Sequence, residues 1–215
     1  MVDQYDIHEV PKVPKQFNQL GIFVLDGSGS MNDPTRDKIS KAEAVDMSMR
    51  EVIGKLKNSR QLKNFSIAVV TFGTSAKQHT PVTPVEQADD YADYNPLKDH
   101  GGGTDIGVGL RCAQGIAQEF LSQADTVRRS VVIIVMSDGL SGGEPLLAAN
   151  AIKAIPEITI CTTLFAAADA VNDTDQGLLQ DIASSPLNYR TTYRAEDLRK
   201  FFIASVSSGK NVDIS

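Results

Sequence analysis

Short apolar runs alternate along this chain with longer amphipathic stretches, and this alternation limits the folds open to it. The runs 20–25 and 131–136 are continuously apolar, and each leads into a loop that contains an aspartate. Because a strand with one face in water alternates polar and apolar residues, unbroken runs predict strands covered on both faces. The six expected strands lie at 20–25, 65–72, 76–85, 131–136, 158–165 and 189–193.

Between these runs, apolar residues recur every three or four positions, as they do along one face of a helix. The stretch 37–57 shows the pattern most fully, with apolar residues at Ile39, Val45, Met49 and Val52. The five expected helices lie at 37–57, 106–121, 145–154, 176–184 and 195–207.

Strands that alternate with helices predict an α/β fold of the doubly wound, Rossmann-like class, in which a mainly parallel sheet carries helices on both faces. The second and third expected strands follow one another across a short turn, which favours an antiparallel pair. The third contains Pro81 and Pro84. Proline cannot donate to a strand ladder, so these residues indicate an edge strand.

The chain length suits one domain, because single cores commonly serve chains of up to about 250 residues. Residues 1–19 are polar, contain two prolines and show no period, so they predict an extended N-terminal arm. The domain itself is expected at 20–208, and 209–215 is expected to form a frayed C-terminal tail.

Charge and cysteine content restrict the partners and the compartment. The formal net charge is −6, with 27 acidic and 21 basic side chains, and it opposes binding to nucleic acid or to anionic membranes. No apolar run is long enough to span a bilayer. The two cysteines, Cys112 and Cys161, lack the spacing of a metal or redox motif and suit a reducing compartment. We therefore expect a cytoplasmic protein.

Oxygen-bearing side chains follow the ends of two expected strands. Asp26 comes directly after the first strand, with Ser28 and Ser30 close behind it, and Asp138 follows the fourth strand. Doubly wound sheets bind ligands beyond the carboxyl ends of their strands, so these carboxylates converge if the two strands are neighbours. Thr104, after three glycines, can close the site from a third side. The all-oxygen set suits Mg²⁺, with Mn²⁺ or Ca²⁺ as alternatives.

These elements resemble the von Willebrand factor type A (VWA) domain, whose metal-ion-dependent adhesion site (MIDAS) is written D-x-S-x-S, then a threonine, then an aspartate. The segments 26–30, 101–105 and 137–139 match the three parts in order, and the likeness runs from about residue 20 to residue 207. The resemblance implies a six-stranded sheet of order 3-2-1-4-5-6 with one antiparallel edge strand.

The resemblance also implies how the site works. Ser28, Ser30 and Thr104 resemble direct ligands of the cation, whereas Asp26 and Asp138 often act through water in this family. Because the direct ligands are then mostly neutral, the cation keeps positive character, and a Glu or Asp of a partner protein can complete its coordination. We therefore expect a non-enzymatic, metal-dependent protein–protein interaction module.

Within the family, the chain looks most like cytoplasmic bacterial members, including the tellurite-resistance type. This likeness implies a role in a bacterial stress-response or ATPase-associated complex. The same fold with a purely structural metal, and with partners bound elsewhere, is an alternative.

Two patterns resemble enzymes. Haloacid-dehalogenase-like phosphatases also place a nucleophilic aspartate after their first strand, so Asp26 could serve a phosphatase, although Ser28 stands where those enzymes carry a second acid. The segment 139–143 matches the G-x-S-x-G pattern of a nucleophile elbow, but no histidine follows residue 100 to complete a triad.

Overall fold

The computed structural model describes residues 17–59, 64–124, 127–139, 141–166 and 173–207. Its centre is one six-stranded sheet of order β3-β2-β1-β4-β5-β6, in which β2 and β3 pair antiparallel and all other neighbours pair parallel. The predicted fold class is confirmed. The strands are β1 (Phe17–Asp26), β2 (Phe65–Phe72), β3 (Ala76–Pro84), β4 (Arg128–Ser137), β5 (Ile158–Phe165) and β6 (Tyr189–Thr192).

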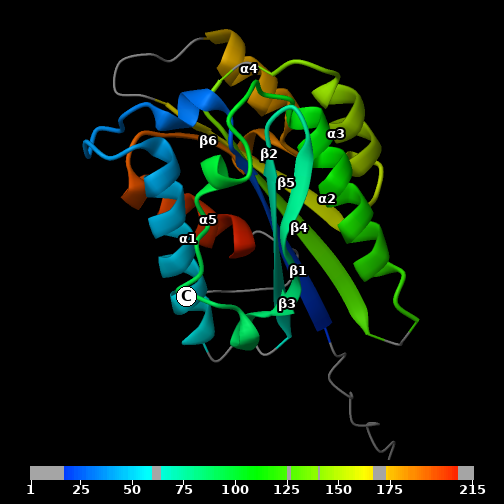
Figure 1. Ribbon diagram of the computed structural model, residues 1–215. Coiled ribbons are helices and arrows are strands. Elements are labelled where there is room, and N and C mark those ends of the chain that lie inside the picture. The colour runs from blue at the N-terminus through cyan, green and yellow to red at the C-terminus, as the bar shows by residue number, and fades with distance from the viewer. Residues whose placement is uncertain (1–16, 60–63, 125–126, 140, 167–172, 208–215) are drawn as a thin grey trace, which may run out of the picture.

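Helices cover both faces of the sheet (Figure 1). The helices α1 and α5 pack on one face, and α2, α3 and α4 pack on the other, so the sheet separates two apolar cores. Alternate residues of β1 show the division, because Phe23 faces α1 and α5 whereas Ile22 faces α2. The helices are α1 (Lys41–Lys57), α2 (Ile106–Leu121), α3 (Pro145–Lys153), α4 (Asp173–Ile182) and α5 (Ala195–Ser207).

Several expected boundaries were wrong, among them the starts of β1, α1, β4 and α4. Strand β1 begins at Phe17, so residues 17–19 belong to the sheet and not to the predicted arm. The rest of that arm, and the predicted tail at 209–215, lie outside the described residues. Helix α1 begins at Lys41 and not at 37, because Ser40 and Glu43 form a capping box that fixes its first turn.

Both edges of the sheet are short or irregular. Strand β3 carries Pro81 and Pro84, and its register with β2 shifts twice between Ile67 and Val70. At the other edge, β6 has four residues. Among the described helices, none is long and apolar enough to cross a membrane.

Candidate metal site at the carboxyl ends of β1 and β4

Strands β1 and β4 are parallel neighbours, so their carboxyl ends meet at one edge of the sheet. Their register aligns Leu25 with Met136. Asp26 therefore ends its strand beside Ser137, whose hydroxyl donates to Asp26 Oδ2 at 2.6 Å. The predicted convergence of the two loops follows directly from the strand order.

Asp26 is fully buried and held from two sides. Besides the Ser137 hydroxyl, the backbone N–H of Ser28 donates to Asp26 Oδ1 at 2.8 Å. Burial raises the pKa of Asp26 to about 6, and the hydrogen bonds from Ser137 and Ser28 lower it only in part. This carboxylate is fixed in orientation and costly to ionise, so a nearby cation would favour its charged form.

A run of hydrogen bonds joins the loop after β1, which carries Ser28 and Ser30, to Asp138. The Ser28 and Ser30 hydroxyls lie 3.1 Å apart, and the Ser30 hydroxyl donates to Asp138 Oδ1 at 2.8 Å. Ser28 is buried, whereas Ser30 is exposed. The structure thus brings four of the five predicted residues into one connected set of oxygens that reaches solvent at Ser30.

The fifth predicted residue, Thr104, lies on a loop that is tied to both neighbouring loops. The Gly29 N–H donates to the Gly102 carbonyl at 2.9 Å, and the Gly142 N–H donates to the Thr104 carbonyl at 2.8 Å. Within the described part of the chain, no group forms a hydrogen bond with the Thr104 hydroxyl. Thr104 itself is half-buried.

Gly27 allows the loops to approach closely. A Cβ atom at this position would lie 2.5 Å from the carbonyl oxygen of Pro96 and 3.0 Å from His100 Cβ. Any larger side chain would push apart the loop that follows β1 and the segment that leads to Thr104. Gly27 is therefore required by the close packing of these two segments.

A polar network anchors that segment to β2 and β3. Asp99 accepts from the Thr71 hydroxyl at 3.0 Å, lies 2.9 Å from His79 Nδ1 and forms an ion pair with Lys77. Burial opposes ionisation of Asp99, but the hydrogen bonds from Lys77, His79 and Thr71 outweigh it and lower its pKa to about 2. The network holds the loop that carries Thr104 against the sheet.

Sequence reasoning missed Ser137 and Lys41. Lys41 is buried, and its Nζ lies 2.6 Å from Asp138 Oδ2. The available signal was the position of Lys41 one helical turn before Val45, on the apolar stripe of α1, where a lysine is unusual. Ser137 ends an otherwise apolar strand, and only the pairing of β4 with β1 shows its partner.

The donor set fits a hard divalent cation. Two carboxylates and three hydroxyls offer oxygen alone, which is the chemistry that Mg²⁺, Mn²⁺ and Ca²⁺ share. No three His, Cys, Asp or Glu side chains in the described ranges come together as metal ligands. Hydroxyl groups would therefore have to supply part of the coordination, as the D-x-S-x-S pattern predicts.

The sequence matches the family model of the von Willebrand factor type A domain over residues 22–206. This chain belongs to the VWA family. No curated protein matches it. The family assignment agrees with the sheet order and with the arrangement of the five helices.

Solved structures with the same fold include pilus proteins. The chain is similar to the von Willebrand factor domain of the type V pili tip protein Mfa5 from Porphyromonas gingivalis, with 13% identity, a TM-score of 0.68 and coverage of 93% of this chain and 99% of that one. It is also similar to the pilus adhesin SpaC from Lactobacillus rhamnosus GG, with 15% identity, a TM-score of 0.69 and coverage of 90% of this chain.

Another solved structure of this fold contains a metal. It is proximal thread matrix protein 1 from the mussel byssus with a zinc-occupied MIDAS motif, with 20% identity, a TM-score of 0.63 and coverage of 89% of this chain and 45% of that one. The present chain spans 31% of SpaC, so it corresponds to one part of that protein. At these identities the likeness shows the fold alone.

Ser141, the serine of the G-x-S-x-G segment, has a structural role. Its hydroxyl accepts from the Ile106 N–H at 2.8 Å and donates to the Gly142 carbonyl at 2.8 Å. These bonds join the loop after β4 to the first turn of α2. The serine thereby helps to hold the Thr104 loop beside Asp138.

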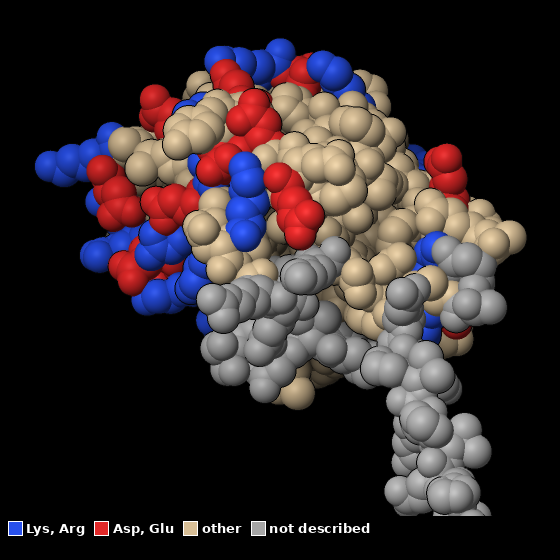
Figure 2. Space-filling view, turned by 90° about the horizontal axis from the view of Figure 1, so that it is seen from below, with Lys and Arg blue, Asp and Glu red and all other residues tan. Residues whose placement is uncertain are grey.

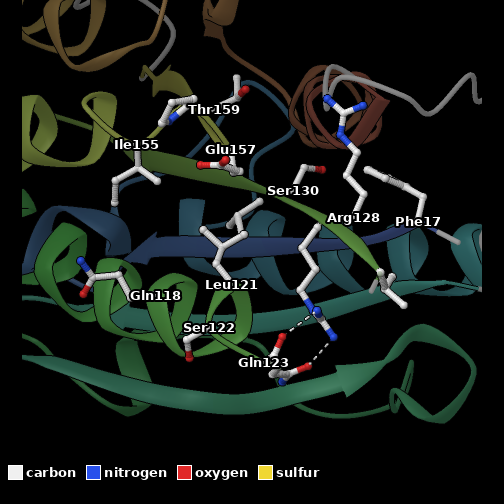
Figure 3. Close-up of a pocket in the computed structure, with 14 residues that line it drawn as sticks. Phe17, Gln118, Leu121, Ser122, Gln123, Arg128, Ser130, Ile155, Glu157 and Thr159 are labelled. Carbon is white, nitrogen blue, oxygen red and sulfur yellow. Dashed lines mark hydrogen bonds between the residues drawn. The ribbon is translucent and has the colours of Figure 1, made fainter. Parts of the chain in front are cut away.

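A cavity of about 630 Å³ lies at the opposite end of the sheet, and none of the five predicted site residues lines it (Figure 3). Phe17 and Glu157 are among the residues that line it. Arg129, which also lines it, donates a hydrogen bond to Gln123 Oε1 at 3.1 Å. Figure 2 shows the molecule from below. Where described residues form this face, acidic and basic side chains are mixed. That part offers no continuous basic surface of the kind that nucleic acid requires.

Proposed function

We propose that this VWA domain is a metal-dependent protein-binding module, in which Asp26, Ser28, Ser30, Thr104 and Asp138 hold a divalent cation for an acidic partner. The observation that carries the proposal is the run of hydrogen bonds from Asp26 through the Ser28 amide and both serine hydroxyls to Asp138, beside Thr104. A bound Mg²⁺, with Mn²⁺ or Ca²⁺ as alternatives, would supply a positive charge that attracts a Glu or Asp of a partner protein.

The proposed site residues differ in burial, and their proposed roles differ accordingly. Asp26 is fixed by Ser137 and by the Ser28 amide, so it supplies negative charge at a constant position. Ser30 is exposed and lies where the set of oxygens meets solvent. The partner's carboxylate would therefore approach over the Ser30 side of the site.

We further propose that the domain is not an enzyme. Position 28 carries a hydroxyl that lies 3.1 Å from Ser30, whereas a phosphatase of the dehalogenase type needs a second acid there. Ser141 is committed to two structural hydrogen bonds. Hydrolysis of a generic phosphate ester with Mg²⁺, if Asp26→Asn abolished it, would overturn this view.

Metal binding predicts a change in thermal stability. A ligand that binds only the folded state stabilises it by mass action, so millimolar Mg²⁺ or Mn²⁺ should raise the Tm above that of metal-stripped protein. Asp26→Ala should remove the response. Differential scanning calorimetry of both proteins checks this, and an unchanged Tm of the parent protein at millimolar metal would contradict the proposed site.

Partner binding predicts a second, separate result. Proteins captured from a lysate of the source cells by the immobilised domain should be lost with EDTA and with Thr104→Ala. The matched control is Thr74→Ala, which removes an exposed hydroxyl from the neighbouring turn. Equal capture by the parent protein and Thr104→Ala, with metal binding intact, would favour the alternative of a purely structural metal.

A cytoplasmic location and a role in a stress-response complex of the tellurite-resistance type stay predictions. No disulfide joins Cys112 and Cys161 in the described part of the chain, and Cys161 is buried, which supports a reducing compartment. The pilus proteins of the same fold give no direct information on this point. Recovery of the protein in the cell-envelope fraction after cell lysis would contradict the predicted location.

A further inference from the structure

We propose that Lys41 acts as a built-in counter-charge of the metal site, which weakens cation binding but leaves the bound cation attractive to an acidic partner. The inference rests on the proposed metal-binding function. Lys41 lies outside the D-x-S-x-S segment and is neither the threonine nor the aspartate of the motif. In this proposal, its charge sets both the affinity of the site for the cation and the affinity of the bound cation for a carboxylate.

The contact between Lys41 and Asp138 is short and shielded from solvent. Lys41 Nζ lies 2.6 Å from Asp138 Oδ2, and 4% of the lysine side chain and 1% of the aspartate side chain are exposed. Asp138 uses its other oxygen, Oδ1, to accept from Ser30. Lys41 therefore holds Asp138 so that Oδ1 faces the serine hydroxyls.

The fold places this cation where it is otherwise unfavourable. Lys41 is the first residue of α1, and the positive end of the helix dipole disfavours a cation there. Burial of an ammonium group also costs free energy unless a partner compensates it. Asp138 is the compensating partner, since the second carboxylate near Lys41, that of Asp33, lies 3.7 Å away and is 60% exposed.

The charges decide what the site attracts. The two carboxylates of Asp26 and Asp138 and the ammonium of Lys41 leave one net negative charge. A divalent cation then gives the site one net positive charge, which favours a carboxylate ligand. Without Lys41 the cation would be fully neutralised, so it would bind more tightly and attract a partner carboxylate less.

The test compares variants of two lysines on the same helix. Lys41→Met removes the charge, Lys41→Gln removes the charge but keeps a donor for Asp138, and Lys41→Arg keeps the charge. Lys57→Met is the matched control. Lys57 Nζ also lies 2.6 Å from an aspartate oxygen, Asp90 Oδ1, but this pair is partly exposed and lies at the other end of α1. Calorimetric titration with Mn²⁺ measures the affinity of each protein.

The Met and Gln variants should bind Mn²⁺ at least about fivefold more tightly than the parent protein, because a nearby positive charge is gone. Lys41→Arg and Lys57→Met should stay within about twofold of the parent. In Mn²⁺-loaded protein, paramagnetic broadening of the acetate methyl signal should be weaker for Lys41→Gln than for the parent.

Each outcome separates the two proposals. No Mn²⁺ binding by the parent protein would defeat the proposed function itself. Binding by the parent, together with unchanged or weaker binding by folded Lys41→Met and Lys41→Gln, would overturn the counter-charge alone, as would equal or stronger acetate broadening in Lys41→Gln. Failure of both variants to fold at saturating Mn²⁺ would also overturn it, because Lys41 would then be needed for folding.

Discussion

At the scale of single residues, Asp26 would connect folding to the proposed metal binding. It is buried without a basic partner of its own in the described part of the chain, and it is held instead by the Ser137 hydroxyl and the Ser28 amide. Its raised pKa means that the folded, metal-free protein binds a proton here more tightly than the unfolded chain does. A cation that favours the ionised carboxylate therefore competes with that proton.

This competition predicts a pH dependence with a definite sign. For metal-free protein, the contribution of Asp26 to stability is fully present below its unfolded pKa of 3.8 and is lost as pH rises through about 6. Mg²⁺ affinity should fall as pH falls through about 6. The rise in Tm caused by Mg²⁺ should therefore be clearly larger at pH 7.5 than at pH 5.0, when each is compared with metal-stripped protein at the same pH. Equal rises at the two values would contradict the prediction.

At the scale of elements, the first turn of α1 determines where Lys41 lies. Ser40 accepts from the Glu43 N–H at 3.2 Å, and Glu43 accepts from the Ser40 N–H at 2.9 Å. These bonds satisfy amide groups that have no partner within the helix. The capping box would therefore support the proposed metal site indirectly, because it fixes the start of the helix that carries the buried lysine.

Loss of this cap should destabilise the domain. Ser40→Ala should lower the free energy of unfolding by about 1 kcal/mol, as capping residues commonly do. Urea denaturation of metal-stripped protein measures the effect. Ser40→Thr keeps a hydroxyl that can accept from the Glu43 N–H and donate to Glu43 Oε2. It serves as the control and should stay near the parent value. A loss below about 0.3 kcal/mol in Ser40→Ala would show that the cap contributes little.

The same helix shows what local patterns can and cannot predict. The apolar period identified its C-terminal end and its buried face. Ile39, however, extended the period past the true start, which is set by the Ser40 and Glu43 side chains. The sequence does contain the Ser40 and Glu43 pair of a capping box, and such a pair predicts the start of a helix better than the apolar period does. Strand β1 was also placed too short, because the polar Asn18 and Gln19 precede the apolar run although they pair in the sheet.

At the scale of the whole molecule, the strand order follows from the alternation of elements and from the family resemblance. Four of the five site residues form the connected set that was expected, because loops after neighbouring parallel strands meet at one edge. Lys41 and Asp138, by contrast, are 97 residues apart in sequence. Only the packing of α1 against the end of β4 brings them together, and no local pattern contains that information.

The edges of the sheet restrict how this molecule can associate with others. Strand β3 ends its side of the sheet with two prolines and an irregular register, and β6 is short. Neither edge offers a long, regular row of free amide and carbonyl groups, so addition of a strand from another chain is disfavoured. Recognition of a partner would thereby fall to side chains at the rims of the sheet, and edge-to-edge aggregation is disfavoured.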